Sequence, residues 1–141
     1  MRFVVDTNVL VAALRSRRGA SNSLLSSVLN SQNIAWLCSV PLFLEYEDVL
    51  MRAEFILETG RSRSDSAGFL SDLAASVDPV ELHFLWRPQL ADPKDEMVLE
   101  TAVNGRADAI VTFHQKDFTP AAPKFGLEIL TPQHALMRSK T

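Results

Sequence analysis

The sequence MRFVVDTNVLVAAL, residues 1–14, contains a short apolar run, a polar interruption and a second apolar run. The first run, Arg2–Val5, ends in two β-branched residues, which is typical of a buried strand. Asp6-Thr7-Asn8 ends this strand, and the pattern of a helix begins at Val9–Leu14. A strand that is followed at once by a helix is how α/β domains begin.

The same alternation continues along the chain. Gly60 and a serine-rich stretch through Ser66 mark a turn, and Gly105 ends the helical pattern that begins at Pro93. Alternating strands and helices with short connections predict a mainly parallel sheet covered on both faces, so we assign the fold class α/β. We expect helices at Gly19–Asn30, Ser39–Ala53, Ala67–Ala75, Pro93–Asn104 and Pro132–Met137, further strands at Ile34–Cys38, Val77–Leu82, Asp108–Phe113 and Leu127–Leu130, and a loop at Arg87–Asp92.

The composition limits the class of protein. With 141 residues, 47% hydrophobic and 22% charged, the chain fits one ordered domain, which we place at residues 1–141. Its single cysteine, Cys38, excludes an internal disulfide and a cysteine-based zinc site, which suits a reducing cytoplasm. Asp6 splits the apolar start, so we expect neither a signal peptide nor a membrane span. The net charge of −3 neither requires nor excludes a nucleic-acid partner.

Polar residues follow two of the expected strands. Asp6 comes directly after the first strand, and Thr112 and His114 follow the apolar strand near residue 110. In parallel sheets the ligand crevice lies beyond the carboxyl ends of the strands, so we expect these side chains at one edge of one sheet. Asp6 has an alternative role as the N-cap of the next helix, and Thr7 and Asn8 suit a cap or turn that orients it.

Asp95 is the most informative acidic residue. On a 3.6-residue period it shares a face with the apolar residues of its helix, while Glu96 and Glu100 are expected to face solvent. A buried carboxylate needs a partner, which a metal ion would supply. The alternative is that Asp92 caps the helix and Asp95 only interacts with the helix dipole.

Helical and loop geometry says less about the roles of the remaining acids. Glu45 and Glu47 lie on opposite edges of the apolar stripe of one helix, and helical geometry cannot choose between them or exclude that both are solvated. Asp117 follows a polar stretch beyond a strand end, where many acids simply face water. His114 has three alternatives: a metal ligand, a phosphate contact or a plain loop residue.

Four stretches together resemble the PIN-domain family over nearly the whole chain. FVVDTNVLVAAL (3–14) is similar to the family's first strand, first acid and following helix, and SVPLFLEYEDVL (39–50) to the helix with the second acid, which falls on Glu45 and not Glu47. DPKDEMVLETAVNGRADAIVTF (92–113) resembles the helix with the third acid, Asp95, and the strand that ends in threonine. HQKDF (114–118) resembles the segment that follows. There His114 stands where many members have asparagine and others aspartate, which leaves Asp117 as the available fourth acid.

The resemblance implies a compact three-layer α/β/α domain with the activity of a metal-dependent endoribonuclease on single-stranded or structured RNA. It is closest to the bacterial VapC-like branch, the toxins of toxin–antitoxin pairs. The implied catalytic residues and metal ligands are Asp6, Glu45, Asp95 and Asp117, and the implied cofactor is Mg²⁺ or Mn²⁺. The implied partners are RNA, a cognate antitoxin protein, and further copies of this chain in a homodimer or higher homo-oligomer.

Two other functions are open to such a chain. A catalytically weak PIN-fold module that binds RNA or protein agrees with the histidine at position 114, although three retained acids argue against it. A phosphatase or nucleotide hydrolase is disfavoured because the sequence has no GxxxxGK[ST] phosphate loop. Carboxylates gathered in one pocket repel each other and attract a cation with oxygen ligands, which favours the metal-dependent reading.

Overall fold

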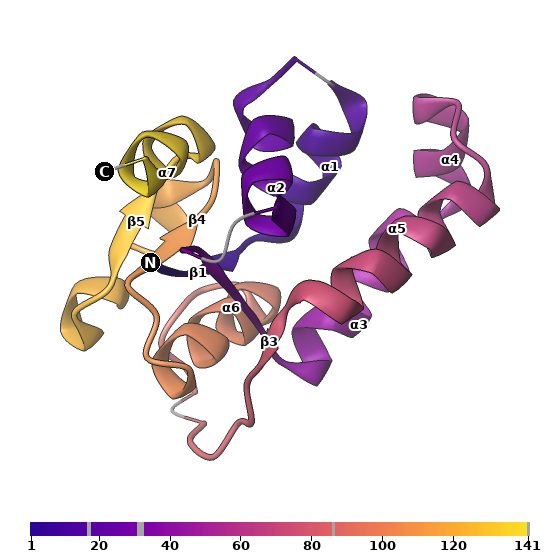
Figure 1. Cartoon of the computed structure of the whole chain (residues 1–141). Helices are drawn as coiled ribbons and strands as arrows, with labels where there is room; N and C mark the ends of the chain where they lie inside the picture. Colours follow the sequence, from indigo (N-terminus) through magenta and orange to yellow (C-terminus); the bar gives the residue numbers. More distant parts are fainter. Residues whose placement is uncertain (17, 31–32, 86, 141) are drawn as a thin grey trace.

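The computed structural model describes residues 1–16, 18–30, 33–85 and 87–140. Within these ranges five parallel strands form one sheet in the order β3-β2-β1-β4-β5, so the first strand of the chain lies at its centre (Figure 1). The expected α/β class is confirmed, and the sheet is parallel throughout. The strands are β1 (Arg2–Val5), β2 (Ala35–Cys38), β3 (Asp78–Pro79), β4 (Ala109–Val111) and β5 (Glu128–Leu130). The helices are α1 (Thr7–Arg15), α2 (Ala20–Asn30), α3 (Val40–Leu50), α4 (Ala53–Thr59), α5 (Arg63–Ser76), α6 (Pro93–Asn104) and α7 (Pro132–Ser139), with short 3-10 helices η1 (Gln115–Asp117) and η2 (Ala122–Phe125).

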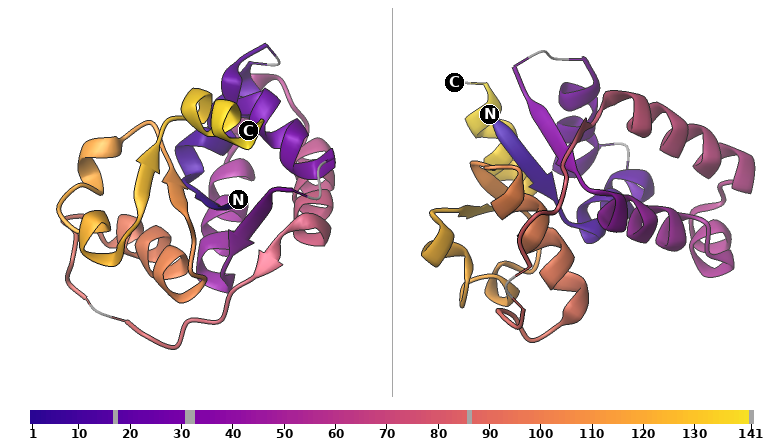
Figure 2. Two further views of the ribbon diagram at one scale, coloured as in Figure 1. Left: turned by 60° about the vertical axis from the view of Figure 1, so that its left-hand side comes forward. Right: turned by 90° about the horizontal axis from the view of Figure 1, so that it is seen from below.

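The central place of β1 follows from its continuous apolar sequence. Phe3 is fully buried and lies opposite Trp36 of β2 on one side and Ala109 of β4 on the other. A strand buried on both faces needs such a run, because neither face meets water. Helices α1, α2 and α7 cover one face and α6 covers the other (Figure 1, Figure 2), which gives the three layers. In the described ranges, no helix is both long and apolar enough to cross a bilayer.

The helix expected at Ser39–Ala53 is shorter than predicted, and a separate helix starts at its expected last residue. The first is α3, and α4 begins in a new direction two residues later. The chain turns because Arg52 has an extended backbone, with φ −66° and ψ 141°. Figure 1 shows α3, α4 and α5 as an arm that extends away from the sheet beyond α1.

Two neighbouring expectations are also corrected. The turn expected through Ser66 is limited to the region of Gly60, which has a left-handed φ of 69° and ends α4. Ser62 then starts α5 through a capping box, in which it accepts a hydrogen bond from the backbone of Asp65 and its own backbone donates to the Asp65 carboxylate. The strand expected at Val77–Leu82 is reduced to the two residues of β3, where Pro79 supplies no N–H to the sheet.

The solvent-facing orientation expected for Glu96 and Glu100 is wrong, because both side chains are buried. The connection between β3 and α6 covers this face of α6. The N–H groups of Gln89 and Leu90 donate to Glu96 Oε1 at 2.6 and 2.7 Å, and Arg87 Nε donates to Glu100 Oε1. A helical period cannot reveal that another segment will cover the polar face of a helix.

Candidate functional site

Asp6 lies at the carboxyl end of the central strand and is almost buried, with 8% of its surface exposed. Its Oδ1 accepts a hydrogen bond from the Thr7 backbone N–H at 2.8 Å, so it also caps α1. Its Oδ2 accepts from the Thr112 hydroxyl at 2.8 Å and from Asn8 Nδ2 at 3.1 Å. Burial raises the pKa of Asp6, and these hydrogen bonds oppose the rise. The capping role and a role in a site are therefore compatible.

The ends of β1 and β4 are tied together around this carboxylate. The fully buried Thr112 accepts a hydrogen bond from the His114 backbone N–H at 3.0 Å while it donates to Asp6. Asn8 Oδ1 accepts from the Phe113 backbone N–H at 3.3 Å. The residues that follow two neighbouring strands thus form one connected polar edge, as expected for the carboxyl ends of parallel strands.

Asp95 is the third residue of α6, and its helix is capped by Asp92, whose side chain accepts from the Lys94 backbone N–H. A helix start favours a negative charge and should lower the pKa of an acid there. The pKa of Asp95 is instead raised to about 6, first by burial and then by the charges of Asp6, Asp117 and Asp92. Asp95 therefore lies close enough to Asp6 and Asp117 for their charges to raise the pKa of its carboxyl group.

Asp117 lies in η1 and is exposed, and its Oδ2 is 3.8 Å from His114 Nδ1. Its negative charge raises the pKa of Asp6 and of Asp95, while the charge of His114 lowers both. The structure thus brings three of the four predicted acids into electrostatic contact at one edge. His114 lies within the same group and offsets part of its charge.

Glu45 is linked to this group through α6. Its side chain is 17% exposed, and its Oε1 is 4.0 Å from Nζ of Lys94, the neighbour of Asp95. Glu47 is exposed and lines a groove between α3 and α5 instead. The packing of α3 therefore separates two glutamates that helical geometry left equivalent.

Tyr46 is a positioning residue that the sequence did not single out. It is fully buried, and its hydroxyl donates to the carbonyl oxygen of Val5, directly before Asp6. This contact holds α3 against the end of β1. Its apolar neighbours marked Tyr46 as a core residue, and no local signal indicates where its hydroxyl points.

The donor chemistry of these residues fits Mg²⁺ or Mn²⁺, because every carboxylate offers oxygen and no thiolate is near. The raised pKa values of Asp6 and Asp95 also indicate negative charge that a cation would compensate. Across residues 1–16, 18–30, 33–85 and 87–140, however, no three histidine, cysteine, aspartate or glutamate side chains are already arranged to hold a metal ion. The group fits the ion in the chemistry of its carboxylate oxygens.

The fold and the site together define a class: a parallel α/β domain with carboxylates collected beyond the ends of its central strands. The family model described as PIN domain matches residues 2–116, and the chain belongs to the PIN domain family. The resemblance found in the sequence is therefore confirmed.

Solved structures agree with this assignment. VapBC2 from Rickettsia felis, crystallised bound to a DNA fragment from their promoter, is similar with a TM-score of 0.66 and 15% identity, over 92% of this chain and 98% of that chain. VapBC-1 from nontypeable Haemophilus influenzae is similar with a TM-score of 0.62 and 13% identity, over 94% and 98% of the two chains. At these identities the likeness concerns the fold. No curated protein sequence matches the chain.

Proposed function

We propose that this protein is a divalent-metal-dependent endoribonuclease and the toxin of a toxin–antitoxin pair. The observation that carries the proposal is the electrostatic coupling of Asp6, Asp95 and Asp117 at one edge of a PIN-domain sheet. Burial raises the pKa of Asp6 and of Asp95, the charge of Asp117 raises both further, and the charge of Asp6 adds to the rise at Asp95. Such perturbed groups concentrate at functional sites.

Each residue has a stated part in phosphodiester hydrolysis. Asp6 and Asp95 would hold the ion directly, Glu45 directly or through water, and Asp117 more weakly. Bound Mg²⁺ or Mn²⁺ polarises the phosphate and lowers the pKa of a water nucleophile. Thr112 fixes the orientation of Asp6 through its hydrogen bond to Oδ2, so that the carboxylate needs little reordering to bind.

The proposed partners follow from the same assignment. Two of the structural neighbours are VapBC proteins, and the sequence resembles the VapC-like branch, so we propose a cognate antitoxin as protein partner. A homodimer or higher homo-oligomer is proposed for the isolated chain. Co-purification with the product of an adjacent small reading frame tests the first, and the mass in solution tests the second.

A second candidate is a PIN-fold module that binds RNA without cutting it. It is favoured by one observation: His114, beside Asp117, stands where many family members have asparagine and others aspartate. This candidate predicts binding of RNA that divalent ions do not convert into cleavage.

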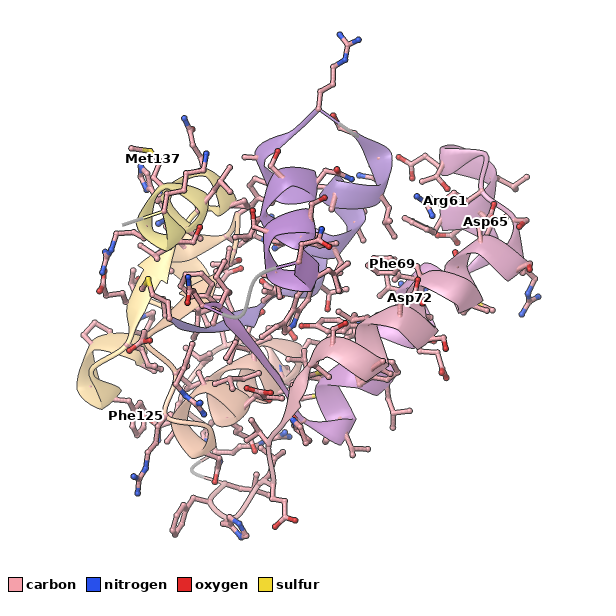
Figure 3. All side chains as sticks on the ribbon, in the orientation of Figure 1. Arg61, Asp65, Phe69, Asp72, Phe125 and Met137 are labelled. Atoms are coloured by element: carbon pink, nitrogen blue, oxygen red, sulfur yellow. The ribbon has the colours of Figure 1, made fainter. Side chains whose placement is uncertain are left out.

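Cleavage of a single-stranded RNA pool in Mg²⁺, Mn²⁺ or EDTA tests the proposal. We expect cleavage with either ion and none in EDTA. Asp6→Asn should abolish cleavage while the fold persists, because asparagine caps a helix as well as aspartate does. Asp65→Asn is the control, since Asp65 lies on the arm away from α6 (Figure 3). Undiminished cleavage in EDTA, or an active Asp6→Asn, would contradict the metal mechanism.

A further inference from the structure

A hollow on the face covered by α1, α2 and α7 reaches Phe113, the residue that follows Thr112. It has a volume of about 350 Å³ and lies between the end of α1, the start of α2 and the start of α7. Phe113 forms one wall, Ala12 and Pro132 add apolar surface, and Ser21 and Gln133 add polar groups. None of the described residues that line it is charged.

Phe113 connects this hollow to the proposed catalytic edge. It directly follows Thr112, which holds Asp6, and its backbone N–H is fixed by Asn8 Oδ1. Its side chain is 49% exposed, although burial of an aromatic ring of this size is strongly favourable. An exposed ring on a fixed backbone, one residue from the site, is suited to stack on a ligand.

Ser21 supplies an independent sign of a ligand. It is 4% exposed, and among the described residues its hydroxyl has no hydrogen-bond partner. A buried hydroxyl without a partner is costly, so such groups usually meet water or a ligand. Ser21 is the second residue of α2, and the starts of α2 and α7 both border the hollow. Helix starts carry partial positive charge, which suits a phosphate beside the hollow.

We propose that this hollow binds one nucleobase of the single-stranded RNA substrate, next to the phosphate that is cut; this rests on the proposed function. Phe113 stacks on the base, Gln133 contacts its polar edge, and the buried Ser21 hydroxyl reaches that edge after a change of rotamer. The volume suits one small ring system, at the low end of small-molecule pockets. Uncharged walls favour a neutral base over the charged side chain of a protein partner.

The test begins with an RNA sequence that the wild-type protein cleaves best from a random single-stranded pool in Mn²⁺. Phe113→Ala should lower kcat/KM for this RNA by roughly 5- to 150-fold, the usual cost of losing one base–aromatic stack. Phe113→Tyr should restore most of the loss, because it keeps the ring. Phe84→Ala is the matched control: Phe84 is 56% exposed and lies at the far end of α6, where Asn104 holds its backbone.

An abasic substitution separates stacking from a structural effect. Removing the base beside the cleaved bond should weaken wild-type cleavage by about the same factor as Phe113→Ala. In the Phe113→Ala protein the same abasic RNA should lose nothing further. Full additivity of the two losses would show that Phe113 does not contact that base. If Phe113→Ala unfolds at a lower temperature than the wild type, Phe113→Leu replaces it in the same comparison of normal and abasic RNA.

Ser21→Ala offers a second readout. It removes a buried hydroxyl without a partner, so the free energy of unfolding should stay equal or rise. Discrimination among the four bases at the position beside the cut should decrease. A Ser21→Ala protein with unchanged base preference would remove Ser21 from the proposed contact.

The two proposals fail in different ways. If the wild-type protein cuts no RNA in Mn²⁺, the proposed function fails and the base pocket fails with it. If the wild-type protein cuts RNA and Phe113→Ala cuts it equally well, only the pocket is overturned. If Phe113→Ala keeps cleavage but loses a co-purified protein partner, the hollow is a protein-docking site and the base assignment is wrong.

Discussion

Asp95→Asn should make the metal-free protein more stable at neutral pH. Asp95 is half-buried at the start of α6, and its pKa is raised to about 6 by burial and then by Asp6, Asp117 and Asp92. Its ionised form is therefore disfavoured in the folded state. Asparagine keeps the shape of the side chain and removes the charge.

The magnitude follows from the pKa. The difference between 3.8 and about 6 corresponds to about 3 kcal/mol, at about 1.4 kcal/mol for each pH unit. Because the side chain is partly exposed, solvent screening reduces this to roughly 1–2 kcal/mol. Since the folded pKa lies above the unfolded one, the folded state binds more protons between pH 3.8 and 6, and stability falls as pH rises through this window. The advantage of the variant is therefore small at pH 4 and complete above pH 7.

Asp65→Asn is a control at the equivalent helix position. Asp65 is the third residue of α5, as Asp95 is of α6, but its pKa is lowered by the backbone and side-chain hydrogen bonds of Ser62. Loss of its charge should destabilise the protein at neutral pH. The two variants should therefore change stability in opposite directions.

Urea unfolding in EDTA from pH 4 to pH 8 measures both variants, beside an RNA cleavage assay in Mn²⁺. The stability advantage of Asp95→Asn over the wild type should grow with rising pH, and the variant should lose most cleavage. An Asp95→Asn protein that is less stable than wild type at pH 7.5 and still active would refute the reasoning. Asp95 would then be only a helix-dipole residue, worth about 0.3–1 kcal/mol.

Three further outcomes are expected. Glu45→Gln should lose most cleavage and Glu47→Gln should keep it, because Glu45 faces α6 and Glu47 faces the groove beside α5. Equal activities of the two variants would show that the assignment of Glu45 as the second acid is wrong. Thr112→Val should move the acidic limb of the pH–activity profile to higher pH, because its hydroxyl lowers the pKa of Asp6; an unmoved limb would exclude Asp6 as the titrating group. Mn²⁺ at about 100 times its Kd should stabilise the wild-type protein by about 2.7 kcal/mol, and Asp6→Asn should abolish most of this shift in thermal melts.

Much of the fold was predictable from local signals. β1 and α6 have the predicted bounds, because a continuous apolar run and a strong cap with a following proline each specify one structure. The break after Leu50 was not predictable, since the apolar pattern runs on through the extended Arg52. The burial of Glu96 and Glu100 depends on a segment that covers them, which no helical period records.

The candidate site was also predictable only in part from the sequence. Chain order alone places Asp6 and Thr112 at one edge, because both follow parallel strands. The orientation of Glu45 depends on how α3 packs against α6, and helical geometry left it open. Phe113 was assigned to a strand end, and its exposure beside a hollow results from where α2 and α7 begin.

The central position of β1 also sets an order of events during synthesis. Its neighbour β2 follows soon after it, whereas the Thr112 hydroxyl that holds Asp6 comes 106 residues later. At about 5–20 residues per second, the ribosome takes roughly 5–20 s to make that interval. Contacts so distant in sequence are also slow to form once they are available. A growing chain therefore carries Asp6 without Thr112 and Asp117, and the acidic edge forms only after both have been made.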